Sequence, residues 1–70
     1  MNNIERAESA RKAIDTFSET TDIESEEMDA KIADLLCNLQ HLADNHEVDF
    51  QECLDRGTRN YTTELELETS

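Results

Sequence analysis

The sequence has little of what bends or reverses a polypeptide chain. Its 70 residues include no proline and one glycine, Gly57. Proline and glycine supply most of the tight turns that connect short strands, so a sheet of several strands has few residues from which to build its turns. This composition favours helix throughout and predicts an all-α protein.

Cysteine and long apolar segments are also scarce. Cys37 and Cys53 are the two cysteines, and they do not form the dense framework of a small disulfide-rich secreted protein. No apolar segment at the N-terminus resembles a signal peptide, and no run approaches the roughly 18 apolar residues of a membrane span. We therefore expect a soluble protein of the reducing cytoplasm that does not bind membranes.

Basic residues are few. Six lysines and arginines stand against 18 aspartates and glutamates, which gives a net charge of −12. Such a chain repels nucleic acid, so direct binding to DNA or RNA is excluded. Residues 1–18 carry balanced charges, whereas residues 19–55 contain twelve acidic residues and one basic residue, Lys31. The acidity therefore belongs to the middle of the chain.

The spacing of apolar residues predicts three helices in a single domain that spans residues 1–70. The first, about 3–18, has a thin apolar stripe at Ile4, Ala7, Ala10 or Arg11, Ile14 and Phe17, and Asn2 or Asn3 caps its start. The second, about 22–44, is expected to begin with a capping box formed by Thr21 and Glu24. Its apolar seam follows a heptad pattern at Met28, Ile32, Leu35, Leu39 and Leu42, and Leu36 and Ala43 widen that seam.

The third helix is expected at about 50–66. Asn45 is predicted to take the left-handed turn that ends the second helix, and Asp49 with Glu52 is predicted to cap the third, with Val48 and Cys53 as a hydrophobic staple. Its apolar face comprises Phe50, Leu54, Gly57, Tyr61 and Leu65. A glycine within a helix costs about 1 kcal/mol relative to alanine, so Gly57 suggests a close helix crossing. Residues 67–70 are predicted to be a frayed acidic tail.

The second and third helices are expected to pair as a hairpin. The thin first helix cannot cover the wide apolar face of that hairpin, so two copies facing each other would form a four-helix bundle. We therefore predict a homodimer, with a bundle of three helices in one chain as the alternative.

Metal-dependent chemistry is not predicted. Cys37, His41, His46 and Cys53 lack the closely spaced ligand pairs of a structural zinc site. Carboxylates at the start of one polar helix do not supply the convergent ligands that magnesium needs. No glycine-rich phosphate loop or nucleophile motif is present. We expect no catalytic residues, no metal and no cofactor.

The acidic surface is the unusual feature of the sequence. Its simplest role is solubility. Carboxylates spaced along helices can also imitate the negative charge of a nucleic-acid backbone and occupy the basic groove of a DNA- or RNA-binding protein. The residues predicted to make such contacts are Glu24, Glu26, Glu27, Asp29, Glu47, Asp49, Glu52 and Asp55.

Two resemblances bear on function. The stretch from Asp34 to Leu65 resembles small uncharacterised proteins of phages, prophages and other mobile elements. The resembling positions are Asp34, Leu35, Leu36, His41, Ala43, Asp44, Asp49, Phe50, Leu54, Tyr61 and Glu64. This likeness implies a setting in which small acidic proteins act against host or defence enzymes.

The same stretch resembles the last two helices of MazG-type all-α nucleotide pyrophosphatases, which bind magnesium through ExxE and ExxD motifs. Here Lys31 lies three before Asp34, and Glu5 with Glu8 is the pair that resembles ExxE. The leading hypothesis is a non-enzymatic protein that binds and modulates a host protein. The alternatives are a degenerate nucleotide pyrophosphatase, and a scaffold or assembly factor whose apolar seam is the functional surface.

Overall fold

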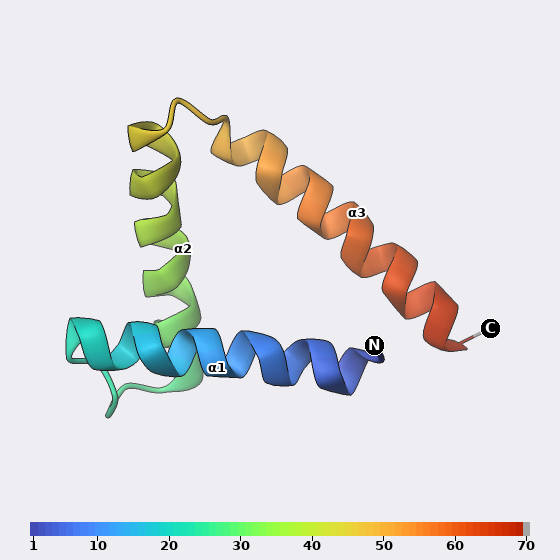
Figure 1. Cartoon of the computed structure of the whole chain (residues 1–70), viewed down its shortest axis with the longest axis horizontal. Coiled ribbons are helices and arrows are strands. Elements are labelled where there is room, and N and C mark those ends of the chain that lie inside the picture. The colour runs from blue at the N-terminus through green and yellow to red at the C-terminus, as the bar shows by residue number, and fades with distance from the viewer. Residues whose placement is uncertain (70) are drawn as a thin grey trace.

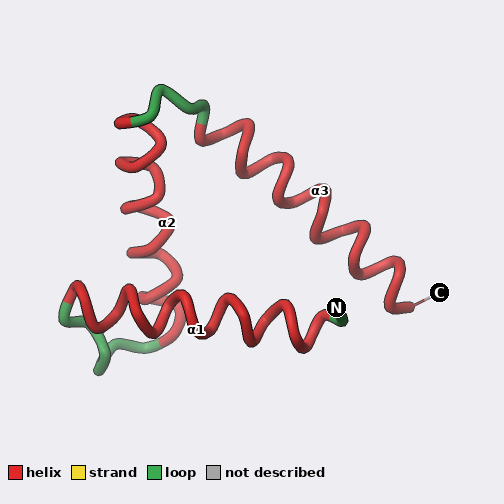
Figure 2. Tube along the Cα trace, viewed as in Figure 1, coloured by secondary structure: helices red, strands yellow, loops and turns green. Residues whose placement is uncertain are grey.

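Three helices are arranged as an open triangle in the computed structural model, which describes residues 1–69 (Figures 1 and 2). They are α1 (Asn3–Thr21), α2 (Met28–Asn45) and α3 (Phe50–Thr69), and no strand occurs among the described residues. The predicted all-α class is confirmed. None of these helices is long and apolar enough to cross a membrane.

Helix α1 is stabilised by its own side chains at both ends. Asn2 and Glu5 form a capping box, in which the Glu5 N–H donates to Asn2 Oδ1 at 2.8 Å and the Asn2 N–H donates to Glu5 Oε1 at 3.1 Å. The expectation that Asn2 or Asn3 caps this helix is confirmed for Asn2. Near the C-terminal end, the hydroxyls of Thr20 and Thr21 donate to carbonyls four residues earlier. The helix thus continues to Thr21 rather than ending near residue 18.

The segment 22–27 is not helical, so the predicted start of the second helix and the Thr21–Glu24 capping box are wrong. Asp22 adopts a left-handed conformation (φ 62°), and the Ile23 N–H donates to the Ser18 carbonyl at 2.9 Å. A hydrogen bond between residues five apart, together with a left-handed residue, is typical of a Schellman motif. This motif ends α1. Helix α2 then begins at Met28, after Glu27, whose side chain makes no capping hydrogen bond.

A second motif of the same kind ends α2. Glu47, rather than Asn45, takes the left-handed conformation (φ 56°), while Asn45 is the last residue of the helix. The Val48 N–H donates to the Ala43 carbonyl at 2.9 Å, and the Glu47 N–H donates to the Asp44 carbonyl at 3.2 Å. The prediction that Asn45 makes this turn is wrong, because the hydrogen bonds place the reversal two residues later.

The predicted cap of the third helix is present. The Glu52 N–H donates to Asp49 Oδ1 at 3.1 Å. The Asp49 carboxylate therefore accepts from one of the backbone N–H groups that have no partner within the helix at the start of α3. The helix then continues to Thr69, so residues 67–69 are helical and not a frayed tail; Ser70 lies outside the described residues.

The two ends of the described chain meet at one corner of the triangle. Helices α2 and α3 diverge from their turn instead of pairing along their length as the predicted hairpin, and α1 spans the open side (Figure 1). Arg6 Nε lies 2.8 Å from Glu64 Oε2, the Asn3 side-chain amide donates to the Glu64 carbonyl at 3.3 Å, and the Asn3 N–H donates to Glu68 Oε1 at 2.6 Å. These bonds join α1 to the last turns of α3.

The buried residues of the described chain lie at one place, where α1 crosses the start of α2. Ile14 is 5% exposed and Ser18 is 1% exposed, and the Ser18 hydroxyl donates to the Ile14 carbonyl at 2.7 Å. Gly57 does not mark a close crossing within the chain, because a Cβ built there would meet no atom within 4 Å. That expectation is wrong, because no other helix approaches Gly57 closely within the described chain.

Candidate functional site

An apolar groove lies between the diverging helices α2 and α3. From α2 it is lined by Leu36, Leu39, Leu42 and Ala43, and from the turn by His46 and Val48. From α3 it is lined by Phe50, Cys53, Leu54, Gly57, Thr58 and Tyr61. We call this surface the α2–α3 groove. It contains no aspartate, glutamate, lysine or arginine, although the chain as a whole is one-third charged.

The predicted apolar seam is divided between two neighbours. Met28 and Ile32 lie with Ile14 beside α1. Leu35 is half-buried, and the remaining predicted positions, Leu39, Leu42, Phe50, Leu54, Gly57 and Tyr61, line the α2–α3 groove. Leu54 is 42% exposed and Tyr61 is 61% exposed. The apolar face of α3 is therefore not covered by the rest of this chain.

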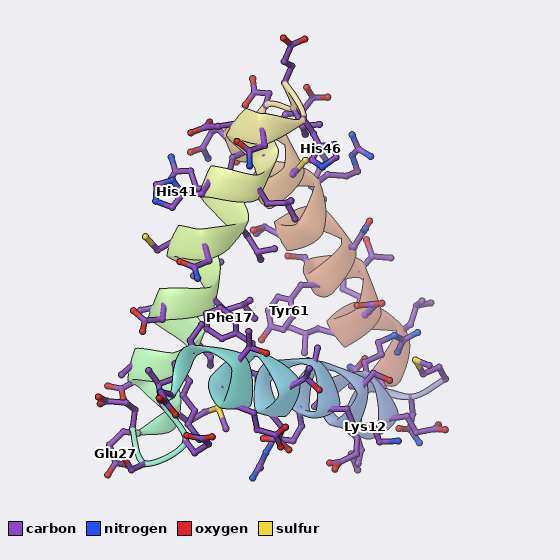
Figure 3. The ribbon with its side chains drawn as sticks, turned by 60° about the vertical axis from the view of Figure 1, so that its left-hand side comes forward. Lys12, Phe17, Glu27, His41, His46 and Tyr61 are labelled. Carbon is purple, nitrogen blue, oxygen red and sulfur yellow. The ribbon has the colours of Figure 1, made fainter. Side chains whose placement is uncertain are left out.

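Aromatic side chains from two helices point into the space that the triangle encloses. Figure 3 shows Phe17 of α1 and Tyr61 of α3 on the inner side, whereas Glu27 and His41 project outward. Phe17 is half-buried, and Tyr61 borders both the α2–α3 groove and the corner formed by Arg6 and Glu64. Aromatic side chains thus face the enclosed space, whereas a carboxylate and an imidazole face outward.

The predicted acidic contact residues gather at two corners, one at each end of α2. Glu24, Glu26, Glu27 and Asp29 lie at the α1–α2 connection, and Glu47, Asp49, Glu52 and Asp55 lie at the α2–α3 turn. We call these groups the first and second acidic corners. Helix α2 has 18 residues, which sets the corners about 27 Å apart at about 1.5 Å per residue. All eight side chains are exposed.

Most of these carboxylates have no basic partner. Within residues 1–69, Glu52 is the one member of the eight with an ion pair, at 3.7 Å from Arg56. The other ion pairs, Arg6 with Glu64 and Arg11 with Asp15, lie on α1 and at its corner with α3. The negative charge of the two acidic corners is therefore almost uncompensated by the protein itself.

The groups considered for metal chemistry are dispersed. No cluster of three or more His, Cys, Asp or Glu side chains in the described part of the chain could hold a metal ion. Cys37 and Cys53 are both free and exposed, and Cys53 lines the α2–α3 groove while Cys37 does not. The Glu5 carboxylate, half of the pair that resembles ExxE, accepts the Asn2 N–H in the helix cap.

Sequence reasoning missed three residues that shape this site. Ser18 reads as a polar end of α1, yet its hydroxyl is satisfied by a carbonyl of its own helix, so it can be buried where α2 begins. His46 is exposed and also lines the groove, and Asp22 sets the direction of the chain between α1 and α2. Aspartate enters the left-handed region more readily than most residues, but several aspartates in this chain share that property.

Comparison with known proteins gives no further guide. No family model, no curated protein and no solved structure matches this chain.

Proposed function

We propose that this chain is a non-enzymatic binding protein whose two acidic corners dock on the basic, nucleic-acid-binding surface of another protein. The carboxylates occupy the positions where that surface would otherwise receive phosphates. The observation that carries the proposal is the pair of acidic corners at the two ends of α2, whose carboxylates, apart from Glu52, lack basic partners within the described chain.

The charge distribution supports this role. Keeping like charges close together opposes folding through mutual repulsion, and a basic partner surface would relieve that repulsion on binding. Complementary charge also accelerates encounter between the two proteins. We further propose that the partner is a host protein, as expected from the resemblance of residues 34–65 to phage and mobile-element proteins.

The test is capture of bacterial proteins on the immobilised chain, followed by displacement with double-stranded DNA. The corner variant carries Glu24→Lys and Glu47→Lys, one change at each acidic corner. Both residues are exposed, and neither side chain makes an ion pair or a capping hydrogen bond. The matched control carries Glu8→Lys and Asp34→Lys, which alter net charge equally on α1 and in the middle of α2.

DNA-binding or RNA-binding proteins should be captured by the unmodified chain and released by the competing DNA. Each reversal replaces an attraction of about 1 kcal/mol by a comparable repulsion, so the corner variant should lose at least about tenfold in capture. The control variant should retain most of it. Equal losses in both variants, or capture that DNA does not displace, would refute nucleic-acid mimicry by the corners.

A further inference from the structure

The chain exposes much more surface than a folded monomer of its mass. Its accessible surface is 5739 Å² at 8.0 kDa. Folded monomers follow a power law that gives about 4,450 Å² at this mass, so the excess is about 1,300 Å². The open triangle therefore leaves about 1,300 Å² of surface exposed that a compact fold of the same mass would bury.

The spread of the chain gives the same result independently. Its radius of gyration is 13.7 Å. A compact globule of the same length would have about 11 Å, and one of twice the length about 14 Å. The radius of gyration of one chain is therefore close to that of a compact protein of twice the length. The α2–α3 groove is part of the open space that causes this.

The energetics of a short chain require that this surface be covered. Ile14 is the buried apolar residue of the described chain, and a core in so small a domain rarely contributes more than about 3–5 kcal/mol even when it is well formed. A second chain that removed the whole of this excess from both partners would bury about 2,600 Å² in total, which sets the upper limit for an interface centred on the groove. That value lies within the range of obligate homodimers.

From these observations we infer that the α2–α3 groove is the interface for a second copy of this chain. A twofold-symmetric contact places the same surface on both partners, so the groove must tolerate its own copy. It does so because its lining has no formally charged side chain, whereas the −12 charge of each copy lies elsewhere. None of the acidic-corner side chains is among the residues that line the groove.

The two cysteines provide a test within one unmodified molecule. Cys53 lies in the groove, and Cys37 lies on α2 one residue after Leu36, about 100° further round the helix. The protein is kept reduced and treated with N-ethylmaleimide across a dilution series, and modification of each cysteine is followed by mass spectrometry. Cys53 should become at least about tenfold less reactive as concentration rises, because association buries it, while the reactivity of Cys37 stays constant.

Sedimentation of the same samples should show a species of twice the 8.0 kDa chain mass. Leu54→Asp places a charge in the groove and should return the mass to that of one chain, whereas Ile4→Asp, at a side chain that is 80% exposed on α1, should leave the dimer intact. If Leu54→Asp unfolds the chain, the comparison of the two cysteines in the unmodified protein still tests the inference. A single-chain mass at every concentration, or equal reactivity of Cys53 and Cys37 throughout, would overturn it.

Discussion

Ile14 and Ser18 illustrate how much of this fold rests on a few side chains. They lie one helical turn apart on α1, at the crossing with α2, and they are the two buried residues of the described chain. The Ile14 side chain lies beside Met28 and Ile32 of α2. Ile14 could be predicted from its place in the apolar stripe, but Ser18 could not, because its burial depends on a hydroxyl bond to its own helix.

Replacing Ile14 by alanine should unfold most of the protein. Truncation of a buried isoleucine costs about 2–5 kcal/mol, which is comparable to the whole stability of a domain this small. Ile4→Ala is the matched control, since it removes the same atoms from a side chain on the same helix that is 80% exposed. Urea unfolding followed by circular dichroism should show a loss of that size for Ile14→Ala and a change within about 0.5 kcal/mol for Ile4→Ala. Similar losses in both variants would contradict the assignment of Ile14 as the core.

The helices themselves could be predicted from sequence, but their ends could only partly be. Asn2 and Asp49 are cap residues of preferred types, and both cap as expected. Asp22 and Glu47 end the first two helices in the left-handed conformation, which is more often taken by glycine or asparagine. An acidic chain offers many such residues, and the spacing of apolar positions does not distinguish among them.

Helix α2 begins without a side-chain cap and can be improved there. Glu27→Asp keeps the charge of the first acidic corner and introduces a residue favoured at helix starts, so stability should rise by about 1 kcal/mol. Glu26→Asp, one residue earlier, makes the same change in side-chain length outside the cap position and should have no effect. Chemical unfolding curves of both variants measure the difference. Equal curves would mean that the chain does not start α2 at Met28.

The apolar groove was predictable as a set of residues but not as a shape. Heptad spacing on α2 and the matching face of α3 identified Leu39, Leu54 and Tyr61 as members of one surface. It did not show that α2 and α3 diverge, because the angle between them is set by the turn at Glu47 and by the contact of Arg6 with Glu64. Local periodicity contains no information about either constraint.

At the scale of the whole molecule, two kinds of surface are separated in space. The α2–α3 groove is apolar, and eight exposed acidic residues lie at the two acidic corners. Apolar contacts are insensitive to moderate salt, whereas attraction between exposed charges is screened by it. The two proposed associations should therefore respond differently to ionic strength.

Raising the salt concentration should weaken binding to a basic partner and strengthen self-association. The first effect follows from screening of the acidic corners, and the second from screening of the repulsion between two chains that each carry −12. Sedimentation equilibrium measures the dimer, and binding to a captured partner protein is titrated in the same buffers. Self-association that weakens as salt rises would show that charged groups, and not the groove, hold the two copies together.

The corner where Asn3 and Arg6 meet Glu64 and Glu68 closes the three helices into a ring. The first turn of α1 lies against the last turns of α3. The same three helices could therefore be connected in a different order along the chain and still form this triangle. A short peptide could join those two ends, and new termini could open at the α1–α2 connection, with every helix left in place. The architecture is in this sense cyclic, although the polypeptide that forms it is linear.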